Sequence, residues 1–274
     1  MRKGIVTFLL VAVVSLVVYA AETLDVYFID VGAGDAILID CGDWEALLDA
    51  GSGHSEMREA VLTTLSEHVD DGIIELAILS HSHADNYGGF GAVLARYEVC
   101  EFWRSFDTEP DTTGTTYSSF LGSLAAKGIL PVLLERGDRF VTGLSEWVVL
   151  GPGELSTGAD NDNENSLVLL LTYGNVRFLF VGDIESNGEA SLLDIELPEG
   201  QLVLKTAHHG SDTSTSAEFL TWADPELAVI STDDVNPPAS AGLSLLGIPS
   251  YITSDVGTIH VSTDGEFVWV ATSP

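Results

Sequence analysis

The sequence HSHADNYGG, residues 81–89, decides the fold of this chain. It contains two histidines separated by one residue, followed by Asp85 and Asn86. Residues 74–80 before it are almost all apolar, which predicts a buried strand with a rigid end. Side chains in a loop at that point have a fixed geometry, and imidazoles combined with a carboxylate are ligands of hydrolytic metal sites. The stretch therefore predicts a metal-binding loop.

Further stretches along the chain belong with this loop. They are YFIDVGAGDAILID (27–40), LLDAG (47–51), NENSLVLLL (163–171), FLFVGDIE (178–185) and LKTAHHGSDTSTS (204–216). With the loop, and in this order, they resemble the metallo-β-lactamase-fold superfamily, whose signature is His-x-His-x-Asp-His. Within it they resemble the soluble domain of ComEC-type competence proteins. The resemblance covers nearly all of the chain after residue 21.

The resemblance implies an α/β fold, a four-layer αββα sandwich in which helices flank two mixed β-sheets. The hydrophobic periodicity predicts a hairpin over 23–40, helices at 55–69, 88–97, 117–127 and 186–193, and a polar loop at 105–116. Further strands are expected at 44–51, 74–81, 99–103, 130–134, 139–141, 145–150, 166–172, 176–181, 201–207, 227–231, 250–253, 257–262 and 266–271. Because no linker interrupts the pattern, residues 22–274 are expected to form one domain.

The resemblance also implies the ligands of a metal centre. His81 and His83 would bind the first ion, Asp85 and His208 the second, and Asp183 would bridge the two. Asp85 and Asp183 are the expected catalytic residues. One or two Zn²⁺ ions are expected, with Mn²⁺ as the alternative. The implied reaction is attack of a metal-bound hydroxide on a phosphodiester, ester or lactone.

Other residues are expected to support this centre. Asp49 and Asn86 would orient the metal ligands through hydrogen bonds. His209, Asn165 and Ser211 are the candidates for contacts with the substrate.

Two positions depart from the family pattern. Asn86 replaces the histidine that ends the signature, and residues 236–238 read Asn-Pro-Pro where this branch carries Gly-His-Pro. An amide oxygen is a weaker zinc ligand than an imidazole nitrogen. The departures leave a second function open, a non-catalytic extracellular binding module on a degenerate metallo-β-lactamase scaffold.

The remaining histidines and the cysteines have less specific interpretations. His54, in a glycine-serine loop, is either exposed or a substitute for the missing ligand, whereas His68 and His260 are expected to be structural. Cys41 and Cys100 either form a disulfide or remain as thiols.

The first residues read as a secretory signal peptide. Arg2 and Lys3 form a positive region, an apolar run follows over 5–18, and cleavage is expected after Ala20 or Ala21. The domain boundaries are therefore a signal peptide at 1–21 and a single domain at 22–274. The mature protein would be secreted or periplasmic; the alternative is an uncleaved membrane anchor.

The charge balance restricts the partners. The chain has 42 acidic residues against 10 basic ones, a formal net charge of −32. Such a surface repels polyanions, so avid nucleic-acid binding is disfavoured and a small molecule or short nucleotide is the expected substrate. Adaptation to salty surroundings also explains the composition. A monomer is expected, without integral membrane association once the signal peptide is removed.

Overall fold

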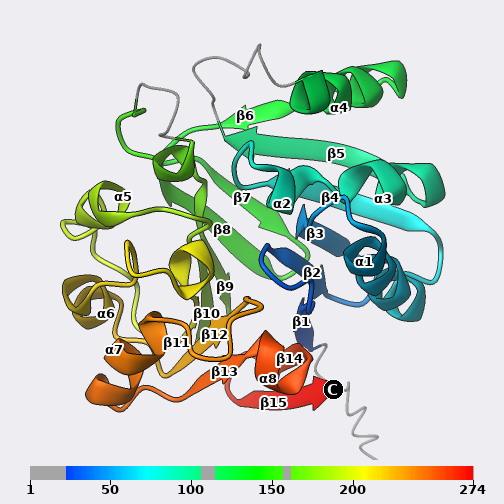
Figure 1. The fold of residues 1–274 in the computed structure, drawn as a ribbon. Helices are drawn as coiled ribbons and strands as arrows, with labels where there is room; N and C mark the ends of the chain where they lie inside the picture. Colours follow the sequence, from blue (N-terminus) through cyan, green and yellow to red (C-terminus); the bar gives the residue numbers. More distant parts are fainter. Residues whose placement is uncertain (1–22, 106–114, 157–161, 274) are drawn as a thin grey trace, which may run out of the picture.

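The computed structural model of the protein describes residues 23–105, 115–156 and 162–273. Two β-sheets pack face to face, and helices cover their outer faces (Figure 1). This is the four-layer αββα sandwich predicted from the sequence. The predicted signal peptide lies outside the described residues. Within them, no helix has the length and apolar character needed to cross a bilayer.

The first sheet has eight strands and is mixed. Antiparallel pairing joins β15, β14, β1, β2 and β3, and parallel pairing continues from β3 through β4 and β5 to β6. In spatial order the strands are β15 (Val268–Ser273), β14 (Thr258–Thr263), β1 (Leu24–Phe28), β2 (Ala36–Asp40), β3 (Glu45–Ala50), β4 (Ile73–Leu79), β5 (Glu98–Ser105) and β6 (Val132–Leu134).

The second sheet has seven strands and is also mixed. Strands β10 to β13 are parallel neighbours, whereas β7 to β10 pair antiparallel. In spatial order the strands are β13 (Ser250–Ile252), β12 (Leu227–Ile230), β11 (Gln201–Lys205), β10 (Val176–Phe180), β9 (Val168–Tyr173), β8 (Ser145–Gly151) and β7 (Arg139–Thr142).

The helices form the two outer layers. The first sheet is covered by α1 (Ser55–His68), α2 (Ala84–Tyr87), α3 (Phe90–Arg96) and α4 (Thr115–Ala126). The second is covered by α6 (Ala217–Ala223) and α7 (Ala239–Leu246), with α5 (Ser186–Ala190) before them in the chain. A short helix, α8 (Thr253–Val256), links β13 to β14, and 3-10 turns lie at η1 (Asn163–Asn165) and η2 (Ala207–Gly210).

An apolar core lies between the two sheets and packs one against the other. Phe28 of β1 lies 6.3 Å from Phe180 of β10, and Trp103 of β5 lies 4.2 Å from Phe140 of β7, measured between ring centroids. Trp147 of β8 is fully buried in the same core. Aromatic pairs of this kind bury large apolar areas and stabilise the sheet-on-sheet contact.

Most predicted elements are present, and the differences have local causes. The expected helix at 88–97 is present as α3. A turn that was not predicted, α2, precedes it, and in this turn the N–H groups of Asn86 and Tyr87 both donate to the His83 carbonyl. Helix α7 was not predicted, since its sequence ASAGLSLL has no regular polar face. Most of the predicted loop at 105–116 lies outside the described residues.

Candidate metal centre

The centre lies where strands of both sheets end. Strands β3 and β4 are parallel, so Asp49 in β3 and His81 just after β4 lie at the same end of the first sheet, where both strands finish. In the second sheet, Asp183 follows β10 and His209 follows its parallel neighbour β11. Ser80 connects the ends of the two sheets, because its carbonyl accepts a hydrogen bond from the Leu167 N–H at 2.9 Å.

His81 is held by contacts on both sides. Asp49, with a positive φ of 56°, accepts a hydrogen bond from the Ser80 N–H at 2.8 Å. The Ser80 hydroxyl contacts His81 Nδ1 at 3.0 Å, which leaves Nε2 directed at the Asp183 carboxylate, 3.4 Å away. The ring of His83 lies edge-on to that of His81 at 4.7 Å.

The ligand atoms form two groups that share Asp183. His81, His83 and Asp183 each offer one atom, all within 4.8 Å of one another, and so do Asp35, Asp183 and His209. His209 Nε2 lies 3.3 Å from Asp183 Oδ2 and 3.8 Å from Asp85 Oδ2. A carboxylate shared by two groups is the arrangement that binuclear sites use to bridge their ions.

His209, rather than His208, faces this group. His208 Nδ1 contacts Glu185 Oε1 at 3.2 Å and Thr213 Oγ1 at 3.3 Å, so this nitrogen is already partnered outside the two ligand groups. Among the described residues the ligand groups include His209 and not His208, whereas the sequence indicated His208 for the second ion and His209 for the substrate. The backbone explains the difference, because both histidines have left-handed conformations, with φ of 46° and 53°. Consecutive left-handed residues are rare and reorient the side chains that follow.

Asn86 directs a donor at the metal ligands. It is 0% exposed, and its Oδ1 accepts a hydrogen bond from the Asp35 N–H at 3.1 Å. Because a backbone N–H requires an acceptor, the amide oxygen is fixed on that side. The amide nitrogen then lies 3.3 Å from His81 Nε2. In this orientation Asn86 offers no lone pair to an ion.

Two residues of the centre, Asp35 and Lys205, were not predicted from the sequence. Lys205 Nζ lies 2.8 Å from Asp35 Oδ1 and 2.9 Å from Oδ2, and both side chains are buried. The chain has three lysines, and Lys205 lies at the end of an apolar strand. A lone cation in that position was the signal in the sequence, because an unpaired lysine is rarely buried.

Burial and nearby charge shift several pKa values. Burial lowers the pKa of His209, but the Asp183 and Asp35 carboxylates outweigh burial and raise it well above its usual range. Burial raises the pKa of Asp183, but His209 and His81 outweigh it and lower the pKa. Burial alone dominates at His81, whose pKa is lowered. At Asp49, burial and then Asp35 raise the pKa well above its usual range.

The residues present fit a divalent metal ion. Asp183 Oδ1 and both ring nitrogens of His209 are buried without a hydrogen-bond partner. Each such atom costs about 1–3 kcal/mol, and coordination would satisfy Asp183 Oδ1 and one ring nitrogen of His209. Imidazole nitrogens with carboxylate oxygens suit zinc and also manganese.

Other predicted site residues lie elsewhere. The Asn165 amide binds the backbone of Ser156 through two hydrogen bonds of 2.8 and 3.0 Å. The Ser211 hydroxyl contacts Thr213, and the exposed His54 contacts Ser52. Cys41 is buried and Cys100 is exposed, and no disulfide joins them.

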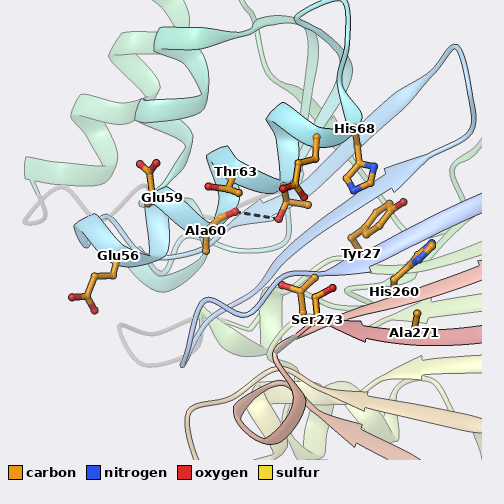
Figure 2. A pocket seen from close by; sticks show the side chains of 12 residues that line it. Tyr27, Glu56, Glu59, Ala60, Thr63, His68, His260, Ala271 and Ser273 are labelled. Atoms are coloured by element: carbon orange, nitrogen blue, oxygen red, sulfur yellow. Dashed lines mark hydrogen bonds between the residues drawn. The ribbon is translucent and has the colours of Figure 1, made fainter.

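A cavity of about 930 Å³ lies away from this centre, between α1 and the β1–β14 region (Figure 2). Tyr27 stacks between His68 and His260, with ring centroids 4.1 and 4.3 Å apart. His260 Nε2 lies 2.6 Å from Asp25 Oδ1. None of the residues that line it is a predicted metal ligand. The metal centre is therefore identified by its ligand groups and not by cavity size.

The αββα sandwich with histidines and aspartates at its strand ends defines the class of metallo-β-lactamase-fold proteins. Residues 24–233 match the family model described as the Metallo-beta-lactamase superfamily, and the chain belongs to this family.

Individual relatives indicate which members of the family the chain resembles. Recombination protein 2 of Haemophilus influenzae is 31% identical over 220 residues, which are 78% of this chain and 25% of that protein. Competence protein ComA of Neisseria gonorrhoeae is 40% identical over 79 residues, 28% of this chain and 11% of that protein. The predicted resemblance to competence proteins is confirmed. The chain spans about a quarter of the length of the longest-matching curated relatives.

Solved structures share the fold. The metallo-beta-lactamase fold protein YhfI of Bacillus subtilis has a TM-score of 0.58 and 13% identity, covering 91% of this chain and 100% of that one. At this identity the likeness shows the fold alone.

Proposed function

We propose that the protein is an exported metal-dependent hydrolase of the ComEC-like branch. The observation that carries this proposal is the pair of ligand groups sharing the buried Asp183. The donor atoms come from both sheets, and several of them have no other partner. Buried acceptors arranged in this way favour a cation.

Each residue would have a defined part. His81, His83 and Asp183 would hold the first ion. Asp183 and His209 would hold the second, with Asp85, 3.8 Å from His209 Nε2, as a further ligand. Asp35, the third member of the second group, is bound by Lys205 and would not bind an ion. A bound divalent ion, Zn²⁺ or Mn²⁺, supplies Lewis acidity and lowers the pKa of water. The Asp85 carboxylate is 39% exposed, so it is accessible to substrate and can accept a proton from the attacking water.

The substrate we propose is a small phosphodiester, ester or lactone, with a short nucleotide included. His83 and Asp85 are partly exposed and give the substrate access from solvent. The net charge of −32 works against long nucleic acids at low salt. We further propose export through the N-terminal signal peptide and action as a monomer.

One observation favours a second function, a non-catalytic binding module. The donor nitrogen of Asn86 is directed at His81, where the superfamily signature has a histidine. Asn86 therefore supplies no ligand to the second ion, and its donor competes with the first ion for the His81 Nε2 lone pair; a scaffold without catalysis would tolerate both. The two functions differ in metal binding: a binding module would have lost both ion sites, whereas the hydrolase requires them.

Metal content tests the metal centre. The purified protein is incubated with zinc or manganese, desalted and analysed for elements. At least one ion per chain is expected, reduced in His83→Ala and unchanged in His68→Ala, a histidine that stacks on Tyr27 outside the centre. Absence of bound metal under both conditions would contradict the hydrolase and favour the binding module.

Hydrolysis of chromogenic phosphodiesters, esters and lactones then tests the reaction. We expect turnover that requires the ion and falls at least about 100-fold in Asp183→Asn, because that variant removes the shared charge. An ion-loaded protein that hydrolyses none of these substrates would favour the binding module.

A further inference from the structure

A buried ion pair lies directly behind His209. Lys205 is the last residue of β11, and Asp35 lies in the β1–β2 hairpin, 170 positions earlier in the chain. The ammonium contacts both carboxylate oxygens, at 2.8 and 2.9 Å, and also donates to the Thr206 carbonyl at 2.9 Å. Both side chains are at most 3% exposed.

Such a pair is costly to build. Moving an ammonium and a carboxylate out of water is unfavourable for each ion, and their attraction compensates only with good geometry. An apolar pair of similar size would stabilise a sheet end as well or better. The pair therefore calls for a reason beyond stability.

The contacts of His209 supply that reason. Its Nδ1 lies 3.7 Å from Asp35 Oδ1, and its opposite nitrogen, Nε2, faces Asp183 and Asp85. At 3.7 Å the contact is longer than a hydrogen bond, but a negative charge on that side favours the proton on Nδ1 and leaves the other nitrogen for an ion. Since Lys205 engages both oxygens of Asp35, Asp35 is held as a fixed acceptor and is not free to become a ligand.

We propose that the Lys205–Asp35 ion pair positions His209, holding its Nδ1–H so that Nε2 faces the second ion site. The proposal rests on the proposed metal function and extends it to residues outside the ligand set. Lys205 fixes Asp35, and the Asp35 backbone N–H fixes the amide of Asn86. The Asp35 carboxylate faces Nδ1 of His209 at 3.7 Å and acts on the ring through its charge.

Two double variants separate positioning from folding. Asp35→Leu/Lys205→Met replaces the pair with apolar side chains of similar size and leaves no buried charge unpaired. Asp35→Asn/Lys205→Met is also neutral but keeps an oxygen that can accept from His209. Asp25→Asn is the matched control, because it removes another carboxylate that contacts a histidine, His260, outside the centre.

The first measurement needs no metal. In ion-free protein, ¹⁵N-edited NMR should show a slowly exchanging downfield Nδ1 proton of His209 in the wild type and in Asp25→Asn. The signal should weaken in the Asn double variant and vanish in the Leu double variant. Circular dichroism confirms that each variant is folded.

The second measurement is zinc binding in competition with a chelator. The second equivalent should bind about 10- to 100-fold more weakly to the Leu double variant, less so to the Asn double variant, and normally to Asp25→Asn. The absorption spectrum of a second equivalent of Co²⁺ should change in the same order.

The outcomes distinguish the two proposals. If the Leu double variant keeps both the His209 signal and the wild-type affinity for the second zinc ion, the positioning role is wrong and the metal centre stands. A different outcome is that the wild type binds no zinc while the His209 signal is present in the wild type and in Asp25→Asn and absent in the Leu double variant. In that case the positioning role stands and the metal function is wrong.

Discussion

Asn86 limits what position 86 offers to the candidate metal centre. Its oxygen is committed to the Asp35 N–H at 3.1 Å, so only its nitrogen faces the ligands. A histidine at this position could accept the same hydrogen bond through Nδ1, because that atom matches the position of the amide oxygen. Its Nε2 would then extend into the second ligand group as a lone pair.

Asn86→His should therefore strengthen the second site. We expect the second zinc ion to bind at least about 10-fold more tightly, measured by chelator competition on wild type and variant. Asn86→Ala is the control, because it removes the acceptor for Asp35 without adding a ligand. It should lower the free energy of unfolding by about 1–3 kcal/mol and leave the second ion no tighter. Equal affinity in wild type and Asn86→His would show that position 86 does not limit the site.

At the scale of elements, Glu164 holds helix α5 against the centre. Its carboxylate accepts hydrogen bonds from the N–H groups of Glu185 at 3.3 Å, Asn187 at 3.1 Å and Gly188 at 2.6 Å. These are unsatisfied donors of the helix N-terminus, where a negative charge is also favourable. Asp183 lies just before this helix, so the cap stabilises the segment that carries the shared ligand.

Glu164→Ala should destabilise this segment. We expect the free energy of unfolding to fall by about 1–2 kcal/mol, with weaker binding of the first zinc ion. Urea unfolding and chelator competition measure the two effects. Glu56→Ala, an exposed residue in the first turn of helix α1, is the control and should change both by much less. A full effect on unfolding with unchanged zinc affinity would show that the cap does not position Asp183.

Neighbouring strands β3 and β4 carry a pH-dependent pair. Burial, and then Glu75, raise the pKa of Glu45 to about 8. An unfolded glutamate loses its proton near pH 4.5, whereas folded Glu45 keeps its proton until about pH 8. The folded state therefore binds more protons in this window, and stability falls as pH rises through it.

Glu75→Gln should reduce this pH dependence. The variant removes the nearby charge and keeps a side-chain acceptor for the Glu45 N–H, which now donates to Glu75 at 3.0 Å. We expect a higher melting temperature than wild type at pH 8, by about 2–4 °C for each kcal/mol gained, and little difference at pH 4.5. Glu98→Gln on the exposed start of β5 serves as control. An identical melting curve at pH 8 would contradict the raised pKa.

The sequence predicted the elements whose side chains repeat in a simple pattern. Buried strands such as β4 and β10 are apolar runs, and the motifs after them locate the centre. Tertiary contacts decided the rest. The choice between His208 and His209 depends on two left-handed residues, which no periodicity records. The Lys205–Asp35 pair joins residues from different sheets, so neither local stretch reveals it.

At the scale of the whole molecule, the charge opposes the compact state. A net charge of −32 on a fold of this size produces self-repulsion that unfolding relieves, since unfolding moves the charges apart. Salt screens this repulsion, with a Debye length of about 10 Å at 0.1 M and about 3 Å at 1 M. The sandwich is therefore expected to be more stable in concentrated salt.

Raising NaCl from 0.1 M to 1 M at pH 7.5, with chelator present, should raise the melting temperature by at least about 2–4 °C, the shift that corresponds to about 1 kcal/mol. The same step at pH 4 is an internal control, because protonation of carboxylates lowers the net charge and should reduce the salt effect. Equal salt effects at both pH values would assign the stabilisation to general exclusion of salt from the protein surface. No effect at pH 7.5 would show that the acidic residues are spaced widely enough to avoid repulsion, and the composition would then need an explanation other than adaptation to salt.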